Sequence, residues 1–169
     1  MKNQTVFLTP QERGNLAREN FLAGYGCAQA VLLAFEDVTG LDPKLAAAMA
    51  SSFGGGMGRM REVCGTVSAA LMVLGVAEGY TDPHDVEGKS RHYARVRDFA
   101  ERFKERCTVR GRASSIVCRE LLAGAHVANQ AGGEAEARTA AYYQKRPCPE
   151  LCAIAAEILE EMLHEEPVT

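Results

Sequence analysis

The order of apolar and polar residues along the chain predicts helices and gives no sign of strands. Between residues 27 and 35, apolar side chains recur at intervals of three and four, which places them on one face of a helix. The charged segment from 93 to 107 repeats this spacing. No segment alternates apolar and polar residues with the period of two that a half-buried strand shows. The pattern therefore predicts an all-α fold.

Helix start signals divide this pattern into a bundle of about six to seven helices. Thr9, Pro10 and Glu12 provide a capping residue, a proline at the first helical position and a capping-box glutamate. Asp-Pro pairs at residues 42–43 and 82–83 repeat the signal. We therefore expect helices to begin at these three places.

Apolar content predicts which helices are buried. The helix expected from about residue 62 to 78 is apolar on every side, so it should form the buried centre. The last helix opens at the prolines that flank Cys148 and should turn the five glutamates between residues 157 and 166 outward. The segment from 124 to 147 is the weakest for regular structure, because adjacent glycines within it indicate a flexible connection.

Length and composition fit one helical domain that spans residues 1–169. Apolar residues make up 47% of the chain and charged residues 24%, which is typical of a globular protein. The formal charge of −3 argues against nucleic-acid binding. The uncharged runs are shorter than the ~18–20 residues that span a bilayer, and the first residues lack the apolar region of a secretory signal. We therefore expect a soluble, cytoplasmic protein without membrane insertion, and the apolar content would allow a homodimer.

Four of the six cysteines stand where a thiol could be activated. Cys27, Cys64 and Cys148 each follow a helix-breaking element and lie near the first turn of a predicted helix. Cys118 has a similar position. Unpaired N–H groups and the helix dipole favour a thiolate there, so we expect lowered thiol pKa values.

The other two cysteines, Cys107 and Cys152, lie on apolar helix faces and are expected to be core residues. The sequence contains no CxxC pair, so zinc-ribbon and thioredoxin-type spacings are absent. A site built from four cysteines would therefore have to be assembled from distant helices.

A glycine-rich loop directly before Cys64 is the candidate cofactor-binding segment. It consists of Gly54, Gly55, Gly56, Gly58 and Arg59. Glycines permit positive φ, and successive N–H groups in such a loop can form a nest for a thiolate or a cluster sulfide. Arg61 would add positive charge. The alternative is a tight turn that packs against a neighbouring helix.

The stretch from Lys89 to Arg112 has nine basic residues against three acidic ones. This excess predicts either a docking surface for an acidic redox partner or a solvated helix face.

Four motifs resemble, in order, those of the C_GCAxxG_C_C family: GYGCAQAVLLAF, FGGGMGRMREVCGTVSAALMVLG, CRELL and RPCPELCAIAAEILEEML. The resemblance covers residues 20–163. It implies redox activity and assigns the four family cysteines to Cys27, Cys64, Cys118 and Cys148. The family's Cys-Gly-Ala-x-x-Gly motif departs here at Thr66 and Ala69. No CxxCH is present, so no c-type haem is expected.

We therefore predict a cytoplasmic redox protein whose four matched cysteines converge and bind an iron–sulfur cluster for electron transfer to a redox partner protein. All-cysteine ligation suits such a cluster or zinc, and split-Soret-type cytochromes look like distant relatives that carry a cluster. The alternatives are a metal-free dithiol–disulfide protein and a non-catalytic zinc module. Cys152 could then serve as a resolving thiol or a substitute ligand beside Cys148.

Overall fold

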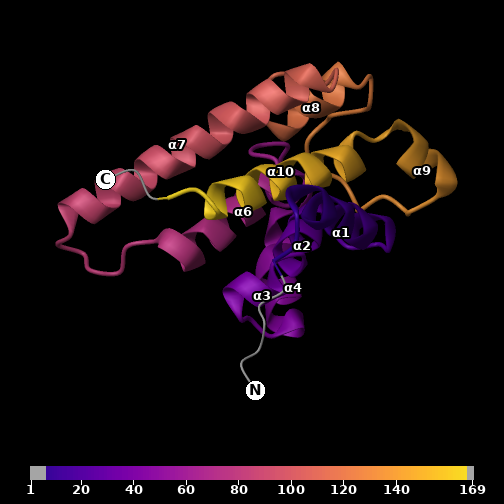
Figure 1. Cartoon of the computed structure of the whole chain (residues 1–169). Coiled ribbons are helices and arrows are strands. Elements are labelled where there is room, and N and C mark those ends of the chain that lie inside the picture. Colours follow the sequence, from indigo (N-terminus) through magenta and orange to yellow (C-terminus); the bar gives the residue numbers. More distant parts are fainter. Residues whose placement is uncertain (1–6, 167–169) are drawn as a thin grey trace.

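Helices begin at Pro10 and Pro43, as the capping signals predict, whereas the helix expected at residues 82–83 begins later, at Val86, and is capped by Asp85. We describe a computed structural model over residues 7–166 (Figure 1). Thr9 caps the first helix, because its Oγ1 accepts from the Glu12 N–H at 3.2 Å and its own N–H donates to Glu12 Oε2 at 2.7 Å. The helices are α1 (Pro10–Leu22), α2 (Cys27–Leu33), α3 (Glu36–Thr39), α4 (Pro43–Ala50), α5 (Gly54–Met57), α6 (Gly65–Glu78), α7 (Val86–Val109), α8 (Cys118–Gly124), α9 (Ala140–Lys145) and α10 (Cys148–Leu163), with a 3-10 turn η1 at Ser51–Phe53.

The all-α expectation is confirmed. Within residues 7–166 there is no strand, and β-type pairing is limited to an isolated antiparallel bridge between Val63 and Val117. The seven longer helices correspond to predicted ones, whereas the short helices α3, α5 and α9 were not predicted. Helices this short carry too few turns to show an apolar repeat.

The buried centre of the molecule is α10, not the uncharged helix α6. Figure 1 shows α10 running through the middle of the fold between α7 and α1, and it also packs on α2 and α6. Every residue of α10 from 151 to 160 is buried. The prediction that α6 would be central is therefore wrong: α6 leaves Val76 exposed.

The glutamates of α10 are mostly paired rather than turned to solvent. Glu160 is 3% exposed and accepts from Arg13 Nε of α1 at 2.7 Å. Glu157 is also buried and pairs with Arg110, the residue that follows α7. These ion pairs let a helix with acidic residues occupy the core, because a buried carboxylate is tolerated when it is paired. The expectation of an outward acidic face is wrong for these two residues.

The basic stretch of α7 is used inside the protein. Arg106 donates to Glu161 of α10 at 2.8 Å through both terminal nitrogens, and Arg95 donates to Glu78 of α6 at the same distance. Bidentate pairs of this kind fix the direction in which two helices pack. Part of the positive charge in this stretch is thus used in ion pairs with other segments, whereas residues such as Arg91 and Arg97 stay exposed, and a docking surface for a partner stays a prediction.

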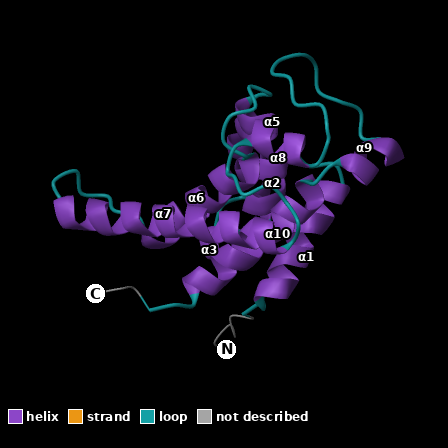
Figure 2. Cartoon of the chain, turned by 90° about the horizontal axis from the view of Figure 1, so that it is seen from above, coloured by secondary structure: helices purple, strands orange, loops and turns teal. Residues whose placement is uncertain are grey.

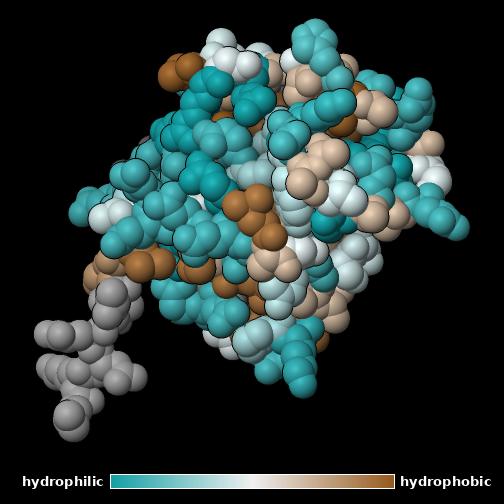
Figure 3. Space-filling model, turned by 90° about the vertical axis from the view of Figure 1, so that its right-hand side faces the viewer, coloured by the Kyte–Doolittle hydropathy of each residue, from teal (hydrophilic) through white to brown (hydrophobic). Residues whose placement is uncertain are grey.

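The hydropathy of the surface and the length of the helices show whether the protein has an apolar segment that could cross a membrane. On the face shown in Figure 3, apolar residues stand in small groups among hydrophilic ones. Within residues 7–166, no helix combines the length and the apolar character that crossing a bilayer requires.

Candidate functional site

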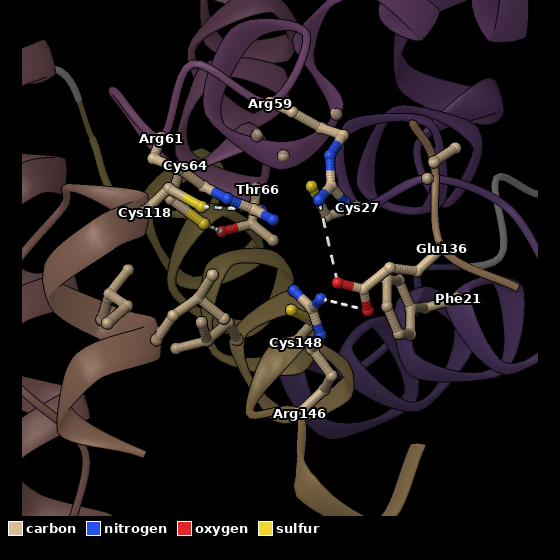
Figure 4. Close-up of a pocket in the computed structure, with 18 of the residues that line it drawn as sticks. Phe21, Cys27, Arg59, Arg61, Cys64, Thr66, Cys118, Glu136, Arg146 and Cys148 are labelled. Atoms are coloured by element: carbon tan, nitrogen blue, oxygen red, sulfur yellow. Dashed lines mark hydrogen bonds and ion pairs between the residues drawn. The ribbon is translucent and has the colours of Figure 1, made fainter. Parts of the chain in front are cut away.

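Four cysteines meet around one cavity, each at the start of a different helix (Figure 4). Cys27, Cys118 and Cys148 are the first residues of α2, α8 and α10, and Cys64 immediately precedes α6. The cavity has a volume of about 360 Å³. The structure thus brings together residues that lie up to 121 positions apart, since the first is 27 and the last is 148.

A short backbone bridge places Cys64 beside Cys118. The Cys64 N–H donates to the carbonyl of Ile116 at 2.8 Å, and the Cys118 N–H donates to the carbonyl of Glu62 at 2.6 Å. These bonds flank the bridge that joins the segment before α6 to the segment before α8. They align the two helix starts, so both thiols lie on the same side of the cavity (Figure 4).

Two glycines allow the thiol-bearing segments to approach closely. A Cβ on Gly65 would lie 2.6 Å from Cys27 Sγ, and a Cβ on Gly56 would lie 2.6 Å from Cys118 Cβ. Both distances are far below ordinary van der Waals contact. Gly65 is the residue after Cys64, so the Cys-Gly pair of the motif has a packing reason: the glycine makes room for a different cysteine.

The glycine-rich loop is a left-handed turn. Residues 55–59 have positive φ throughout, between +57° and +69°, and Arg61 follows at +60°. Each non-glycine residue in this region costs about 1–2 kcal/mol, so the conformations of Met57, Arg59 and Arg61 are held by their surroundings. The turn places the side chains of Arg59 and Arg61 in the wall of the cavity (Figure 4).

Several N–H groups at the end of this loop bond to the loop's own carbonyls, and a nest formed by the glycine N–H groups stays a prediction. The N–H groups of Arg59, Arg61 and Glu62 donate to the carbonyls of residues 54, 55 and 56, so they are not available to an anion. Gly54, Gly55 and Gly58 line the cavity, whereas Gly56 is buried beneath Cys118. The positive charge that the loop brings to the cavity comes from its arginine side chains.

The charged residues of the cavity are mostly arginines. Two come from the glycine loop and two from the segments on either side of α9, and one carboxylate accompanies them. They are Arg59, Arg61, Arg138, Arg146 and Glu136. The cavity is therefore electropositive while its thiols are protonated, and the starts of four helices add their partial positive charge.

Two of the thiols have polar partners in the cavity wall. Arg61 Nη1 lies 3.8 Å from Cys118 Sγ, and the Arg61 side chain is almost completely buried. Cys64 Sγ lies 3.1 Å from Thr66 Oγ1. Thr66 is one of the two departures from the family motif, and its hydroxyl here supplies a hydrogen bond that alanine lacks.

The thiol pKa values do not follow the expectation from helix starts. The pKa of the Cys64 thiol is raised well above its usual value. Burial is the main cause, and the electrostatic effect of Cys27 adds to it. Burial likewise raises the pKa of Cys148 to about 12. The pKa of Cys118 is raised by burial, although Arg61 acts in the opposite direction. Loss of hydration therefore outweighs the helix dipole, and these three thiols are protonated at neutral pH.

Cys107 and Cys152 are outside the cavity and belong to the core. Both are completely buried and free, and neither lines the cavity. Cys152 Sγ faces the carbonyl of Cys27 at 3.9 Å. Burial raises the pKa of both thiols, to about 11 for Cys107.

The thiols are spread around the cavity rather than gathered at one point. Among the residues that the structure describes, no three His, Cys, Asp or Glu side chains lie close enough together to hold a single metal ion. In Figure 4, Cys64 and Cys118 lie on one side, and Cys27 and Cys148 lie apart from them. The space between the thiols is large enough for a group of several atoms.

Sequence reasoning missed several residues of the cavity wall: Thr66, Glu136, Arg138 and Arg146. The segment from 124 to 147 carries no regular pattern, so nothing in it indicated that its charged residues would reach the cavity. One signal was present: a basic residue stands shortly before two of the cysteines, as Arg61 before Cys64 and Arg146 before Cys148.

Comparison with known proteins places the chain in a family. Residues 25–162 match the sequence model described as "Putative redox-active protein (C_GCAxxG_C_C)". The chain belongs to the C_GCAxxG_C_C family. Searches among curated proteins and among solved structures gave no match. The description of the C_GCAxxG_C_C family indicates a redox-active protein, and its name contains four cysteines, as many as line the cavity.

Proposed function

We propose that this C_GCAxxG_C_C protein binds an iron–sulfur cluster through Cys27, Cys64, Cys118 and Cys148 and transfers electrons with it. The observation that carries this proposal is the meeting of four cysteines, each from a different helix start, around one electropositive cavity. Iron–sulfur clusters are held by four thiolates, and a cluster with four such ligands carries net negative charge. The arginines of the cavity wall suit that charge.

The spread of the thiols favours a cluster over a single zinc ion. Zinc with four cysteine ligands needs every sulfur at about 2.3 Å from the metal. The four cysteines surround a cavity of about 360 Å³ and no three of the described acidic, histidine or cysteine side chains are gathered around one point. A cluster, in which the sulfurs bind different irons, fits that arrangement with less movement of the helices.

The residues around the thiols would tune such a cluster. When bound, a cluster would accept and release one electron. Reduction potentials depend on hydrogen bonds to the sulfurs, on nearby charge and on exposure to solvent. Arg61 beside Cys118 and the Thr66 hydroxyl beside Cys64 are placed to stabilise the more negative, reduced form. A redox partner protein would exchange the electron, and a reducing compartment such as the cytoplasm would keep the thiols free.

The test is anaerobic purification followed by assays for iron, acid-labile sulfide and zinc on one sample, with a visible spectrum. We expect iron and sulfide in near-equal amounts and charge-transfer bands. Cys27→Ser combined with Cys64→Ser should abolish both while helix content persists. The matched control is Cys107→Ala combined with Cys152→Ala, which changes two cysteines outside the cavity and should retain the cluster.

Other results would replace the proposal with one of its alternatives. Zinc without iron would indicate a structural zinc module. Protein without metal after reconstitution with iron and sulfide would refute the cluster and leave dithiol–disulfide chemistry, measurable as a reduction potential of the thiols. Colour that survives the double serine variant would show that the ligands are assigned wrongly.

A further inference from the structure

The cavity has a second polar centre on the side where Glu136 lies between two arginines (Figure 4). Glu136 Oε2 accepts from Arg146 Nη2 at 2.6 Å, and Glu136 Oε1 lies 3.8 Å from Arg59 Nη2. The hydrogen bond from Arg146 lowers the pKa of Glu136, so the carboxylate is charged at neutral pH. Two guanidinium groups are thus positioned to hold one carboxylate.

Arg146 is fixed more firmly than the carboxylate that it holds. The Arg146 side chain is only 5% exposed and stacks over the Tyr142 ring at 4.6 Å, whereas the Glu136 side chain is 41% exposed. Arg59 Nε also donates to the carbonyl of Gly132 at 3.0 Å. The arginines therefore belong to the cavity wall, and Glu136 reaches them from the solvent side.

Glu136 belongs to a segment that lacks regular structure. Residues 125–139 connect α8 to α9 as a long loop (Figure 2). Positive φ angles at Gly132 and Gly133 bend this loop over the cavity. The loop is bonded to the cavity wall at Gln130 and Gly132, but Glu136 itself is exposed, so its side chain can leave the arginines while the rest of the loop stays in place.

The cavity contains more positive charge than Glu136 can balance. Among residues 7–166, Arg61 and Arg138 form no ion pair with a carboxylate, and Arg61 is only 2% exposed. A buried cation without a counter-charge is costly. Arg61 faces the thiol side, where the proposed cluster would provide negative charge. On the other side, Arg59 and Arg146 would remain cationic whenever Glu136 leaves.

Beside the arginines the wall is apolar. Its side chains are Phe21, Leu121, Leu122, Tyr142 and Leu151. A cavity of about 360 Å³ with apolar walls and a few converging polar groups is typical of a site for a small organic molecule. Because the two arginines hold a carboxylate in this structure, the complementary ligand is a carboxylate on a small apolar body.

We propose that Arg59 and Arg146 form a binding site for a small organic carboxylate next to the four thiols, and that Glu136 occupies this site as an internal competitor. An incoming carboxylate displaces the side chain of Glu136, which turns to solvent. The site does not depend on whether the thiols carry a cluster.

Titration with butyrate, followed by ¹⁵N–¹H NMR spectra at constant ionic strength, tests the proposal. Butyramide is the neutral control, because it has the same shape without the charge. We expect saturable shifts for amides in the loop 125–139 and at the start of α10 with butyrate, and none with butyramide. Iron content is measured separately on the same sample, so failure of the carboxylate site and failure of the cluster are distinguishable.

Variants separate the site from general charge effects. Glu136→Gln removes the competitor and should lower the half-saturating butyrate concentration by about tenfold, because the fraction of protein ready to bind rises. Arg59→Gln should raise it by about tenfold or more through loss of a charge-assisted hydrogen bond, and Arg146→Gln should do the same. The matched control Arg97→Gln removes an exposed arginine of α7 and should change nothing.

Three results would overturn the proposal. Shifts that never saturate, or that butyramide reproduces, would show that no carboxylate site exists. Equal half-saturation in wild type and Glu136→Gln would show that Glu136 does not compete. Because Arg146 is buried, its variant could fail to fold, and Arg59→Gln then decides: unchanged butyrate binding in that variant would exclude the arginine pair.

Discussion

Replacement of Gly65 by alanine tests whether the start of α6 is shaped around the thiol of Cys27. The added Cβ would lie 2.6 Å from Cys27 Sγ and 2.6 Å from the carbonyl oxygen of Phe53. To reach ordinary contact, the sulfur would have to move by about 1 Å. The carbonyl belongs to the backbone and cannot rotate away, so the helix start itself must shift. We expect a loss of stability together with displacement of the thiol.

A second glycine in the same helix provides the control. A Cβ on Gly75 would meet no heavy atom within 4 Å, so Gly75→Ala should stabilise the protein by about 0.5–1 kcal/mol through helix propensity alone. Gly65→Ala adds the cost of overpacking, typically about 1–3 kcal/mol. Both variants add one methyl group to α6, so the difference between their free energies of unfolding contains the overpacking, together with a smaller contribution that arises because Gly65 is the first residue of the helix and Gly75 lies inside it.

Urea denaturation followed by circular dichroism at 222 nm, a general helix signal, measures that difference. With an m-value of about 1–3 kcal/mol/M, we expect the two midpoints to differ by about 1 M. Iron content after reconstitution provides the second readout, and it should fall for Gly65→Ala and stay unchanged for Gly75→Ala. Equal midpoints with equal iron content would refute the view that Gly65 is present to accommodate Cys27.

Two further predictions concern the core. Arg13→Met leaves the carboxylate of Glu160 buried without its arginine, so the free energy of unfolding should fall by about 3–5 kcal/mol in urea denaturation. Arg91→Ala removes an exposed pair with Glu87 and should cost only about 0.5 kcal/mol or less; similar losses in both variants would contradict the argument. Burial raises the pKa of Cys107 from about 9 to about 11, so the folded protein retains a proton that the unfolded chain releases, and stability should fall as pH rises through this range. Cys107→Ala should lessen that fall in denaturation midpoints measured between pH 8 and 11, and an unchanged fall would show that this thiol titrates normally.

Local signals in the sequence predicted the helices, but not which of them is central. Capping residues such as Thr9 act within one turn, so they can be recognised without knowledge of the fold. The burial of α10 depends on Arg13 and Arg110, which neutralise Glu160 and Glu157 from other segments. An apolar-content argument cannot anticipate such pairs, and it therefore selected α6.

The site was predictable only in part for a similar reason. The position of each cysteine at a helix start follows from adjacent glycine and proline residues, and the sequence shows these directly. The pKa expectation was wrong because burial depends on the packing of all helices, and it outweighs the dipole of any single one at Cys64 and Cys148. Glu136 could not be assigned, because only the path of the irregular loop brings it to the cavity, whereas the place of Arg146 just before Cys148 was visible in the sequence.

The central place of α10 has a consequence for how the protein is made. Its residues leave the ribosome after all the other helices, yet α1, α2, α6 and α7 pack on it. Until α10 emerges, those helices lack the surface that buries their apolar faces, so the nascent chain should remain largely unfolded and accessible to chaperones. Cys148 arrives with the same helix, and the thiols of Cys27, Cys64 and Cys118 therefore stay exposed until α10 has emerged. Insertion of any metal or cluster into the four-cysteine site would have to wait for that point.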